Sequence, residues 1–227
     1  MVSIDKVYQK VLAFANKEQR GYITPQEFNL FADQAQMEIF EQYFYDLNQF
    51  MRLPGNSEEY SDMIHNINEK IALLENTSAI VNSAITANDM YRLGTVIRSG
   101  DTIVEEIQQN DILEMNMSYL TKPTNKRPVY VRTGLLTINF YGSNGMEDFN
   151  GTCTYTKKPS KPNWGYVVVN GKAMYNPSNK TDFELHPAEE SELVYKILKF
   201  AGVSMRRDDI AKVAQALELS QVQQEKQ

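Results

Sequence analysis

The chain has 227 residues, of which 42% are hydrophobic, and a formal net charge of −6. This hydrophobic fraction excludes bulk disorder, and the acidic balance, without a tract rich in lysine or arginine, disfavours stable binding of DNA or RNA. A single cysteine, Cys153, excludes an internal disulfide. The start carries no secretory signal, and no apolar run reaches the ~18 residues of a membrane span, so we expect a soluble protein made in a cytoplasm.

The first quarter of the chain has the periodicity of helices. Residues 3–19 place apolar side chains on one face, with Ser3 as a possible N-cap and Gly21 as a stop. A further helix is expected over residues 57–74, where isoleucine and leucine recur on one side.

Between these two segments, Thr24 and Glu27 have the spacing of a capping box, with Pro25 at the first helical position. The helix that they begin is expected to run to about Phe50. It carries a broad aromatic stripe, and more aromatic residues than one small partner helix can cover, so part of this face is a candidate for contact with another subunit. The members chosen as interface candidates are Phe28, Phe31, Phe40 and Phe44.

From about residue 77 the pattern changes to short β-branched runs separated by glycine and proline. Asn170-Gly171 is typical of a two-residue hairpin turn, and residues 102–116 are compatible with an inserted helix. Strands are expected at residues 78–86, 91–98, 128–133, 135–142, 152–157, 165–170 and 181–185.

Helical periodicity returns after Pro187, and Gly202 is a possible end of that helix. A last amphipathic stretch contains Ile210, Val213 and Leu217 before a polar tail. The order of helices, strands and helices predicts an α+β fold, with an N-terminal helical part, a central antiparallel β-rich part and a C-terminal helical segment. The expected divisions are residues 1–76, 77–186 and 187–227.

The patterns of known catalytic and metal sites are missing or incomplete. Residues 16–27 resemble part of an EF-hand calcium loop, but Arg20 would place a cation where an oxygen ligand is needed, and the capping box explains Glu27 better. The two histidines, His65 and His186, lie far apart, and His186 is better explained as a hydrogen-bonding residue at a corner. We therefore expect no catalytic residue, no metal site, no cofactor and no enzymatic activity.

The segment from Lys157 to Tyr166 is the most unusual in composition, with two prolines, three lysines and Trp164, the only tryptophan. One interpretation is a hairpin whose tip docks on a neighbour, with Trp164 as the anchor. A second is a contact to nucleic acid, with the lysines on phosphate and Trp164 stacked on a base. The third is a basic surface loop with Trp164 tucked under the sheet.

Several strings, in this order, resemble a family of virion structural proteins of tailed phages, the marine podoviruses and the crAss-like phages. They are residues 6–12, residues 15–49 with Gly21-Tyr22-Ile23-Thr24-Pro25-Gln26-Glu27-Phe28-Asn29 at the centre, residues 120–130, Lys158-Pro159 with Asn163-Trp164-Gly165-Tyr166, Asp182-Phe183-Glu184-Leu185-His186-Pro187, residues 196–203 and residues 223–227.

The resemblance implies a ring protein of the phage neck and tail barrel, located in the virion and made in the host cytoplasm. Its expected partners are copies of itself in a twelve-fold ring, the portal and the adjacent ring or tail proteins, with DNA passing through and no membrane. A ring subunit needs two different adhesive faces. The aromatic helix and residues 205–220 are candidates for these faces, and we expect the C-terminal segment to pack on a neighbour. The alternative is a soluble, non-enzymatic binding module for nucleic acid or another phage protein.

Overall fold

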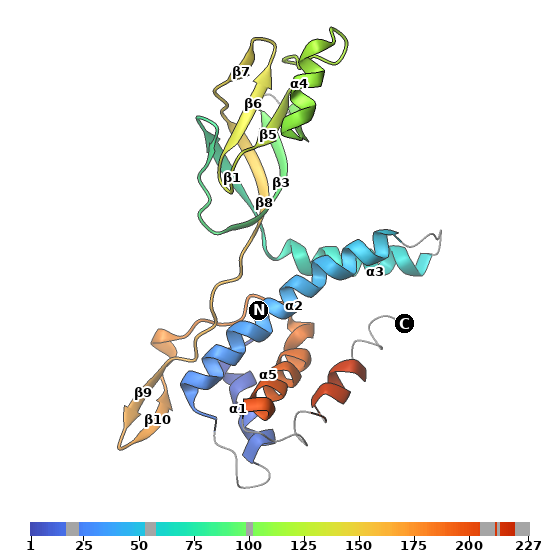
Figure 1. Ribbon diagram of the computed structural model, residues 1–227. Coiled ribbons are helices and arrows are strands. Elements are labelled where there is room, and N and C mark those ends of the chain that lie inside the picture. Colours follow the sequence, from blue (N-terminus) through green and yellow to red (C-terminus); the bar gives the residue numbers. More distant parts are fainter. Residues whose placement is uncertain (17–22, 53–57, 99–101, 205–211, 213, 221–227) are drawn as a thin grey trace. The chain divides into compact units, whose positions relative to one another are not determined.

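The computed structural model describes residues 1–16, 23–52, 58–98, 102–204, 212 and 214–220 (Figure 1). The chain forms two compact units, Met1–Leu73 with Pro159–Gln227, and Leu74–Lys158. The first is mostly helical and the second mostly β, which confirms the predicted α+β class. The division differs from the expected boundaries, because residues 159–186 group with the helices and not with the sheet.

In the unit Leu74–Lys158, the described residues form one sheet of eight strands and one helix. The spatial order of the strands is β2-β1-β8-β3-β4-β5-β6-β7. In chain order the elements are β1 (Glu75–Val81), β2 (Ala84–Ile85), β3 (Met90–Arg98), β4 (Thr102–Ile107), α4 (Gln109–Met117), β5 (Val129–Arg132), β6 (Ile138–Gly142), β7 (Gly145–Glu147) and β8 (Gly151–Lys157).

All neighbouring strands in this sheet are antiparallel except β4 and β5. A parallel pair needs a crossover between its strands, and α4 lies in that crossover. Ile112 of α4 is buried against Val129 and Val131 of β5. The predicted helix at residues 102–116 is therefore correct only in its second half, since residues 102–107 pair with two strands.

Two local irregularities of the sheet are set by particular residues, and the strand expected at residues 91–98 is confirmed as β3. Residues 78–86 were expected to form one strand, but Asn82 and Ser83 adopt positive φ angles of 49° and 64° and turn the chain between β1 and β2. Strand β3 shifts register against β8 around Gly94. A Cβ at Gly94 would lie 2.7 Å from the Thr154 hydroxyl oxygen, so this close approach requires glycine.

The helical unit is built from segments at both ends of the chain. α2 packs along α5, and α1 packs on α5 as well (Figure 1). Its elements are α1 (Ile4–Asn16), α2 (Pro25–Arg52), α3 (Glu58–Ala72), β9 (Tyr166–Val169), β10 (Lys172–Tyr175), the 3₁₀ turns η1 (Pro177–Asn179) and η2 (Pro187–Glu189), and α5 (Glu190–Ser204). Residues 214–220 are also helical.

The starts of α1 and α2 are held in different ways. At α2 the capping box is confirmed, because Glu27 N–H donates to the Thr24 hydroxyl at 3.3 Å and the Glu27 carboxylate accepts from Thr24 N–H at 2.9 Å. At α1 the first helical N–H, that of Ile4, donates to the Asp182 carboxylate at 3.0 Å. A residue 178 positions away in the sequence thus serves this end of α1. The predicted cap Ser3 accepts from Val7 N–H at 3.3 Å with its backbone carbonyl.

The C-terminal half of the helical unit confirms one further expectation and corrects two. The Asn170-Gly171 hairpin turn is confirmed, with φ of 51° and 73° between β9 and β10. Residues 181–185 form no strand and make only isolated bridges, of Thr181 with Asn163 and of Phe183 with Val2. Gly202 does not end α5, which continues to Ser204.

Candidate interaction surfaces and an acidic pocket

Three of the predicted interface aromatics lie in the core of the helical unit. Phe28, Phe40 and Phe44 are buried. The ring of Phe28 lies 4.6 Å from that of Tyr8, and Phe40 packs edge to face on Phe44 at 5.1 Å. Because these rings are covered by the chain's own residues, they offer no side-chain surface to another subunit, which corrects the interface prediction for all three.

The remaining interface candidates differ in their exposure to solvent and in whether the structure describes them. Phe31 is half-buried, 6.4 Å from the ring of Phe200, and Leu217 is 41% exposed, so both can still contact a partner. Ile210 and Val213 lie outside the described residues.

Trp164 is buried and joins distant segments of the helical unit. Its indole Nε1–H donates to the Asp5 carboxylate at 3.0 Å, and its backbone N–H donates to the Asn29 side-chain oxygen at 2.8 Å. Its ring lies 4.3 Å from that of Tyr8 and stacks with Tyr175 at 5.6 Å. Both interpretations that need an exposed indole, as a docking anchor or a stacking platform for bases, are therefore corrected. Trp164 is a core residue of the helical unit, where its ring packs on Tyr8 of α1 and Tyr175 of β10.

The helical residues 214–220 are joined to α5 of the same chain by ion pairs. Ala214 and Glu218 are buried. The Glu218 carboxylate accepts from Lys196 at 2.7 Å and from Lys199 at 3.0 Å. Burial alone would raise the pKa of Glu218, but the hydrogen bonds and charges of the two lysines outweigh it and hold this pKa below its ordinary value. This part of the C-terminal segment packs on α5 of its own chain, and the expected contact with a neighbour stays a prediction.

The β9–β10 hairpin exposes apolar side chains. Val167, Val168, Val169 and Met174 are all exposed, and the two strands pair only with each other. Successive side chains of a strand point to opposite faces, so both faces of the hairpin carry exposed apolar groups. An isolated two-stranded hairpin is marginally stable, which makes this one a candidate contact surface.

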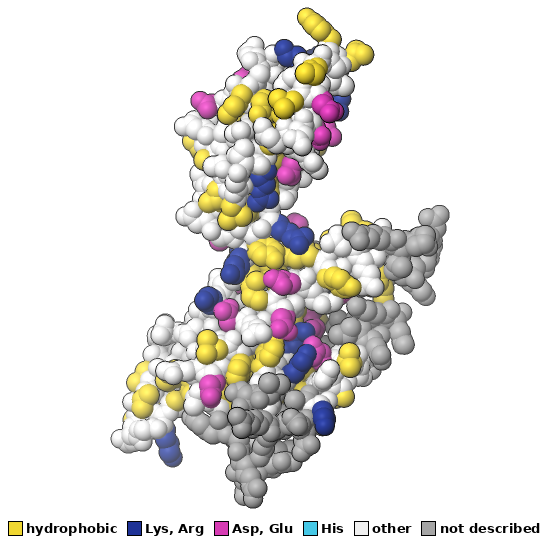
Figure 2. Space-filling model, viewed as in Figure 1, with side chains coloured by type: hydrophobic (Ala, Val, Ile, Leu, Met, Phe, Trp, Pro, Cys, Tyr) yellow, Lys and Arg dark blue, Asp and Glu magenta, His cyan; other side chains and the backbone are white. Residues whose placement is uncertain are grey.

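A second apolar surface lies in the β-rich unit just after α4. Met117 is 89% exposed, Leu120 95%, and Tyr119 is fully exposed. Hydrophobic side chains project from this end of the unit in Figure 2. Three large apolar groups within four residues cannot be explained by packing inside the chain, since none of them is covered.

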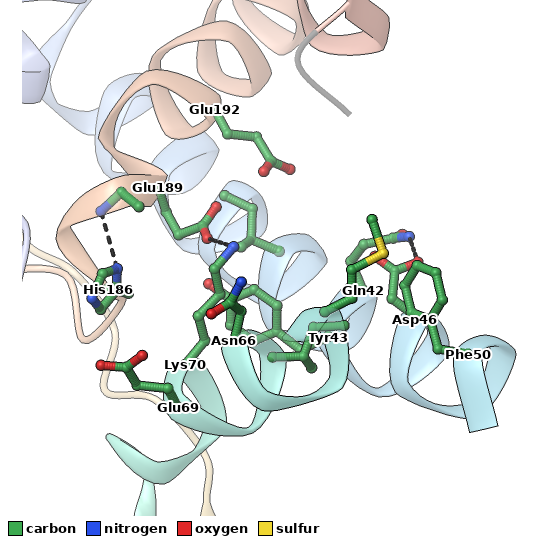
Figure 3. A pocket seen from close by; sticks show the side chains of 14 residues that line it. Gln42, Tyr43, Asp46, Phe50, Asn66, Glu69, Lys70, His186, Glu189 and Glu192 are labelled. Atoms are coloured by element: carbon green, nitrogen blue, oxygen red, sulfur yellow. Dashed lines mark hydrogen bonds and ion pairs between the residues drawn. The ribbon is translucent and has the colours of Figure 1, made fainter. Parts of the chain in front are cut away.

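The helical unit also contains a pocket of about 370 Å³ between α2, α3 and the start of α5 (Figure 3). Its size is that of ligand pockets in general. The apolar part of its wall is formed by Ile39, Tyr43, Phe50, Met63, Ile67 and Ala188. The charged part holds four carboxylates, those of Asp46, Glu69, Glu189 and Glu192, against one ammonium group, that of Lys70.

Glu189 is the most buried acid of the pocket. Its side chain is 1% exposed, and its Oε1 lies 2.6 Å from Lys70 Nζ, the contact drawn in Figure 3. Lys70 Nζ also lies 5.6 Å from the centre of the Tyr43 ring. Neither Glu189 oxygen accepts a hydrogen bond of good geometry from the described residues. The ion pair with Lys70 therefore stabilises a carboxylate that is almost completely removed from solvent.

The other predicted residues have structural roles. His186 forms the N-cap of η2, where its Nδ1 accepts from Ala188 N–H at 3.3 Å, as the sequence predicted. His65 is exposed on α3. Glu27, the last position of the calcium-loop alternative, is used in the capping box. Cys153 is buried, which raises the pKa of its thiol.

Within the described ranges, no three His, Cys, Asp or Glu side chains are grouped so that they could hold a metal ion. None of the helices in those ranges has the length and apolar content of a membrane span. Comparison with models of known protein families gives no match, and comparison with curated proteins gives none either.

Sequence reasoning missed both the acidic pocket and the apolar surface after α4. The pocket joins residues around 46, 66 and 189, which only the packing of three helices brings together. The apolar surface had a local signal, the run Met117-Ser118-Tyr119-Leu120 just before Pro123. The inserted helix was expected to end at residue 116, so this run fell outside every predicted element.

Proposed function

We propose that this protein is a structural subunit of a tailed-phage virion, a ring component of the neck and tail barrel that joins the portal and capsid to the tail and forms part of the DNA conduit. The resemblance of its strings to virion structural proteins supports this family of functions. The structural observation that supports it most is the uncovered apolar surface formed by Met117, Tyr119 and Leu120.

A ring subunit needs two unlike adhesive surfaces, because a head-to-tail contact closes a ring only when one face of each copy meets a different face of the next. The chain offers unlike surfaces of this kind. The apolar residues after α4 belong to the β-rich unit, and the β9–β10 hairpin belongs to the helical unit. Exposed apolar groups at both places are typical of a protein that functions as part of an assembly.

The charge balance also suits a conduit for DNA. With 29 acidic against 23 basic side chains, the subunit has a net charge of −6. A negatively charged wall repels phosphate, so DNA slides past such a wall without being held.

Trp164 does not support the alternative of a nucleic-acid binding module. Its ring is covered by Tyr8 and Tyr175 and cannot stack on a base. The proposed role is non-enzymatic, and its partners are other copies of the chain and the neighbouring virion proteins.

The test is to locate the protein on purified particles with a gold-labelled antibody raised against the chain. We expect label at the junction of capsid and tail. Particles that carry no label, from an infection in which the protein is abundant in the cell lysate, would contradict a virion role. Antibody against the portal protein serves as the positive control for access to the neck.

A further inference from the structure

Residues 117–122, called the tip from here on, form an ordered projection. α4 ends at the extended residue Ser118, whose N–H donates to the Met115 carbonyl at 3.3 Å, and Lys122 N–H then donates to the Ser118 carbonyl at 3.0 Å in a separate turn. The Thr121 hydroxyl donates to the Met115 carbonyl at 3.2 Å. The backbone of the tip is thus fixed before any partner arrives, which reduces the entropy lost on binding.

The tip combines apolar and positive side chains. Its apolar members are the exposed Met117, Tyr119 and Leu120. Lys122 follows them and is exposed, as is Lys126 a few residues later. Neither lysine forms an ion pair with another described residue, whereas Arg127 lies 3.5 Å from Glu105. Acidic residues of α4, Asp111 and Glu114, precede the tip and leave its positive charge at the far end.

The pocket of the helical unit combines apolar and negative side chains. Figure 3 shows Phe50 and Asp46 on α2, and Asn66 and Glu69 on α3. Glu69 and Asn66 are exposed, and Asp46 is half-buried and accepts from the Gln42 amide at 2.8 Å. The pocket therefore offers an apolar floor with carboxylates at its wall, and it has the opposite charge to the tip.

We propose that the tip of one copy docks in the acidic pocket of a second copy. Leu120 and Tyr119 enter beside Phe50, Met63 and Ile67, and Lys122 lies against Glu69 and Asp46. The contact joins two different surfaces, so it is heterologous and repeats from copy to copy. It rests on the proposed function, for which it supplies the contact between neighbouring subunits.

The complementarity assigns different roles to the two kinds of side chain. Burial of the three apolar groups supplies the affinity, because exposed apolar area is removed from water on both partners. The lysine opposite Glu69 sets which pocket is chosen and how fast the surfaces meet, and this part weakens with salt. The buried Lys70–Glu189 pair already neutralises the deepest acid, so the incoming lysine meets the outer carboxylates.

The direct test is cross-linking between two variants of the full chain that each carry one added cysteine. Leu120→Cys is mixed with an affinity-tagged Asn66→Cys chain under mild oxidation, and disulfide-linked dimers are counted. The native Cys153 does not compete, because it is buried and its pKa is raised. Met146→Cys, at another exposed apolar position of the β-rich unit, is the matched control.

We expect dimers of Leu120→Cys with Asn66→Cys at least tenfold above those of Met146→Cys with Asn66→Cys. Equal yields would overturn the proposal. So would a disulfide that forms only within one chain when both cysteines are placed in the same molecule, because the tip would then occupy its own pocket.

A charge exchange tests the specificity of the contact by sedimentation. Lys122→Glu should weaken self-association about tenfold, and combining it with Glu69→Lys should restore most of the loss. Lys6→Glu, at an exposed position of α1 that belongs to neither proposed surface, should leave association unchanged. A loss without recovery in the combined variant would contradict the pairing, and a chain that stays monomeric at every concentration would contradict the contact. Failure of these tests for a protein that gold labelling places on the particle would refute this contact and leave the virion role intact.

Discussion

Trp164 shows how single residues hold the helical unit together. Its side chain contacts Asp5 and Tyr8 in α1, and its backbone donates to Asn29 in α2. The loop that contains it is thereby fixed to two helices from the other end of the chain. Its role is structural, although its isolation in a lysine-rich loop suggested a contact to a partner.

We expect Trp164→Ala to lower the free energy of unfolding by about 3–5 kcal/mol, because it removes a large buried ring and leaves a cavity. Asp5→Asn removes the charged acceptor of the indole N–H and should cost less, about 1 kcal/mol. Urea denaturation followed by circular dichroism measures both. An iodide quenching experiment on the wild type checks the premise, since a readily quenched Trp164 would contradict its burial.

Thr24 and Glu27 give a prediction with a defined pH dependence. The backbone N–H and then the hydroxyl of Thr24 donate to Glu27 and lower the pKa of this exposed carboxyl. Because the pKa of Glu27 is lower in the folded state, its ionised carboxylate stabilises the native state above the unfolded pKa of about 4.3. This contribution to stability is lost as the pH falls through the folded pKa.

Thr24→Ala should therefore lower stability by about 1 kcal/mol at pH 7, and the difference from the wild type should shrink below about pH 4. Thr24→Ser keeps the hydroxyl and is the matched control. Urea unfolding at pH 7 and pH 3.5 measures the difference. A Thr24→Ala variant as stable as the wild type at pH 7 would show that the capping box contributes nothing.

At the level of whole elements, the packing of residues 214–220 on α5 depends on the carboxylate of Glu218. Its lowered pKa means that its contribution is present above the unfolded value and fades in acid, while the raised pKa of Lys196 extends the pairing to alkaline pH. For Lys196, burial acts against the charged form, and Glu218, Glu192 and Glu38 outweigh it.

Glu218→Gln should increase deuterium uptake in residues 214–220 at pH 7, with no change in α2. Gln215→Ala, an exposed change in the same helical stretch, serves as the control. Unchanged uptake in the Glu218→Gln variant would mean that these residues are held by apolar packing, such as that of Ala214, and not by the two lysines.

Local signals in the sequence predicted the elements that they govern. The Thr24–Glu27 box and the Asn170-Gly171 turn are set by residues three apart or adjacent, and both were found where expected. Strand β4 was taken for helix, because its run of glutamate and isoleucine carries no clear period and its partners lie elsewhere in the chain. The acceptor at the start of α1, Asp182, and the pocket acid Glu189 are supplied by the opposite end of the sequence, where no local pattern can indicate them.

At the level of the whole molecule, the β-rich unit is inserted in the helical unit. Its first and last residues are neighbours, since Lys157 N–H donates to the Leu74 carbonyl at 2.9 Å and β1 pairs with β8. It also has a hydrophobic core of its own, in which Phe140 stacks on Phe149 at 4.6 Å. Closely spaced ends and a separate core are the properties of an independent folding unit.

The fragment Leu74–Lys158 should therefore fold by itself, with a cooperative thermal transition and the circular dichroism of a sheet. The reciprocal chain, in which a short glycine-serine linker joins Leu73 to Pro159, should retain the buried Trp164 and its fluorescence. A fragment without a cooperative transition would show that the sheet needs the helical unit in order to fold.

The copy number of this protein in purified particles, measured by quantitative mass spectrometry against the portal protein, tests the proposed role most directly. A ring component stacked below the portal predicts a fixed ratio of one or a small whole multiple in every preparation. A variable ratio, or absence of the chain from particles that contain the portal, would contradict the assignment to the neck and tail barrel.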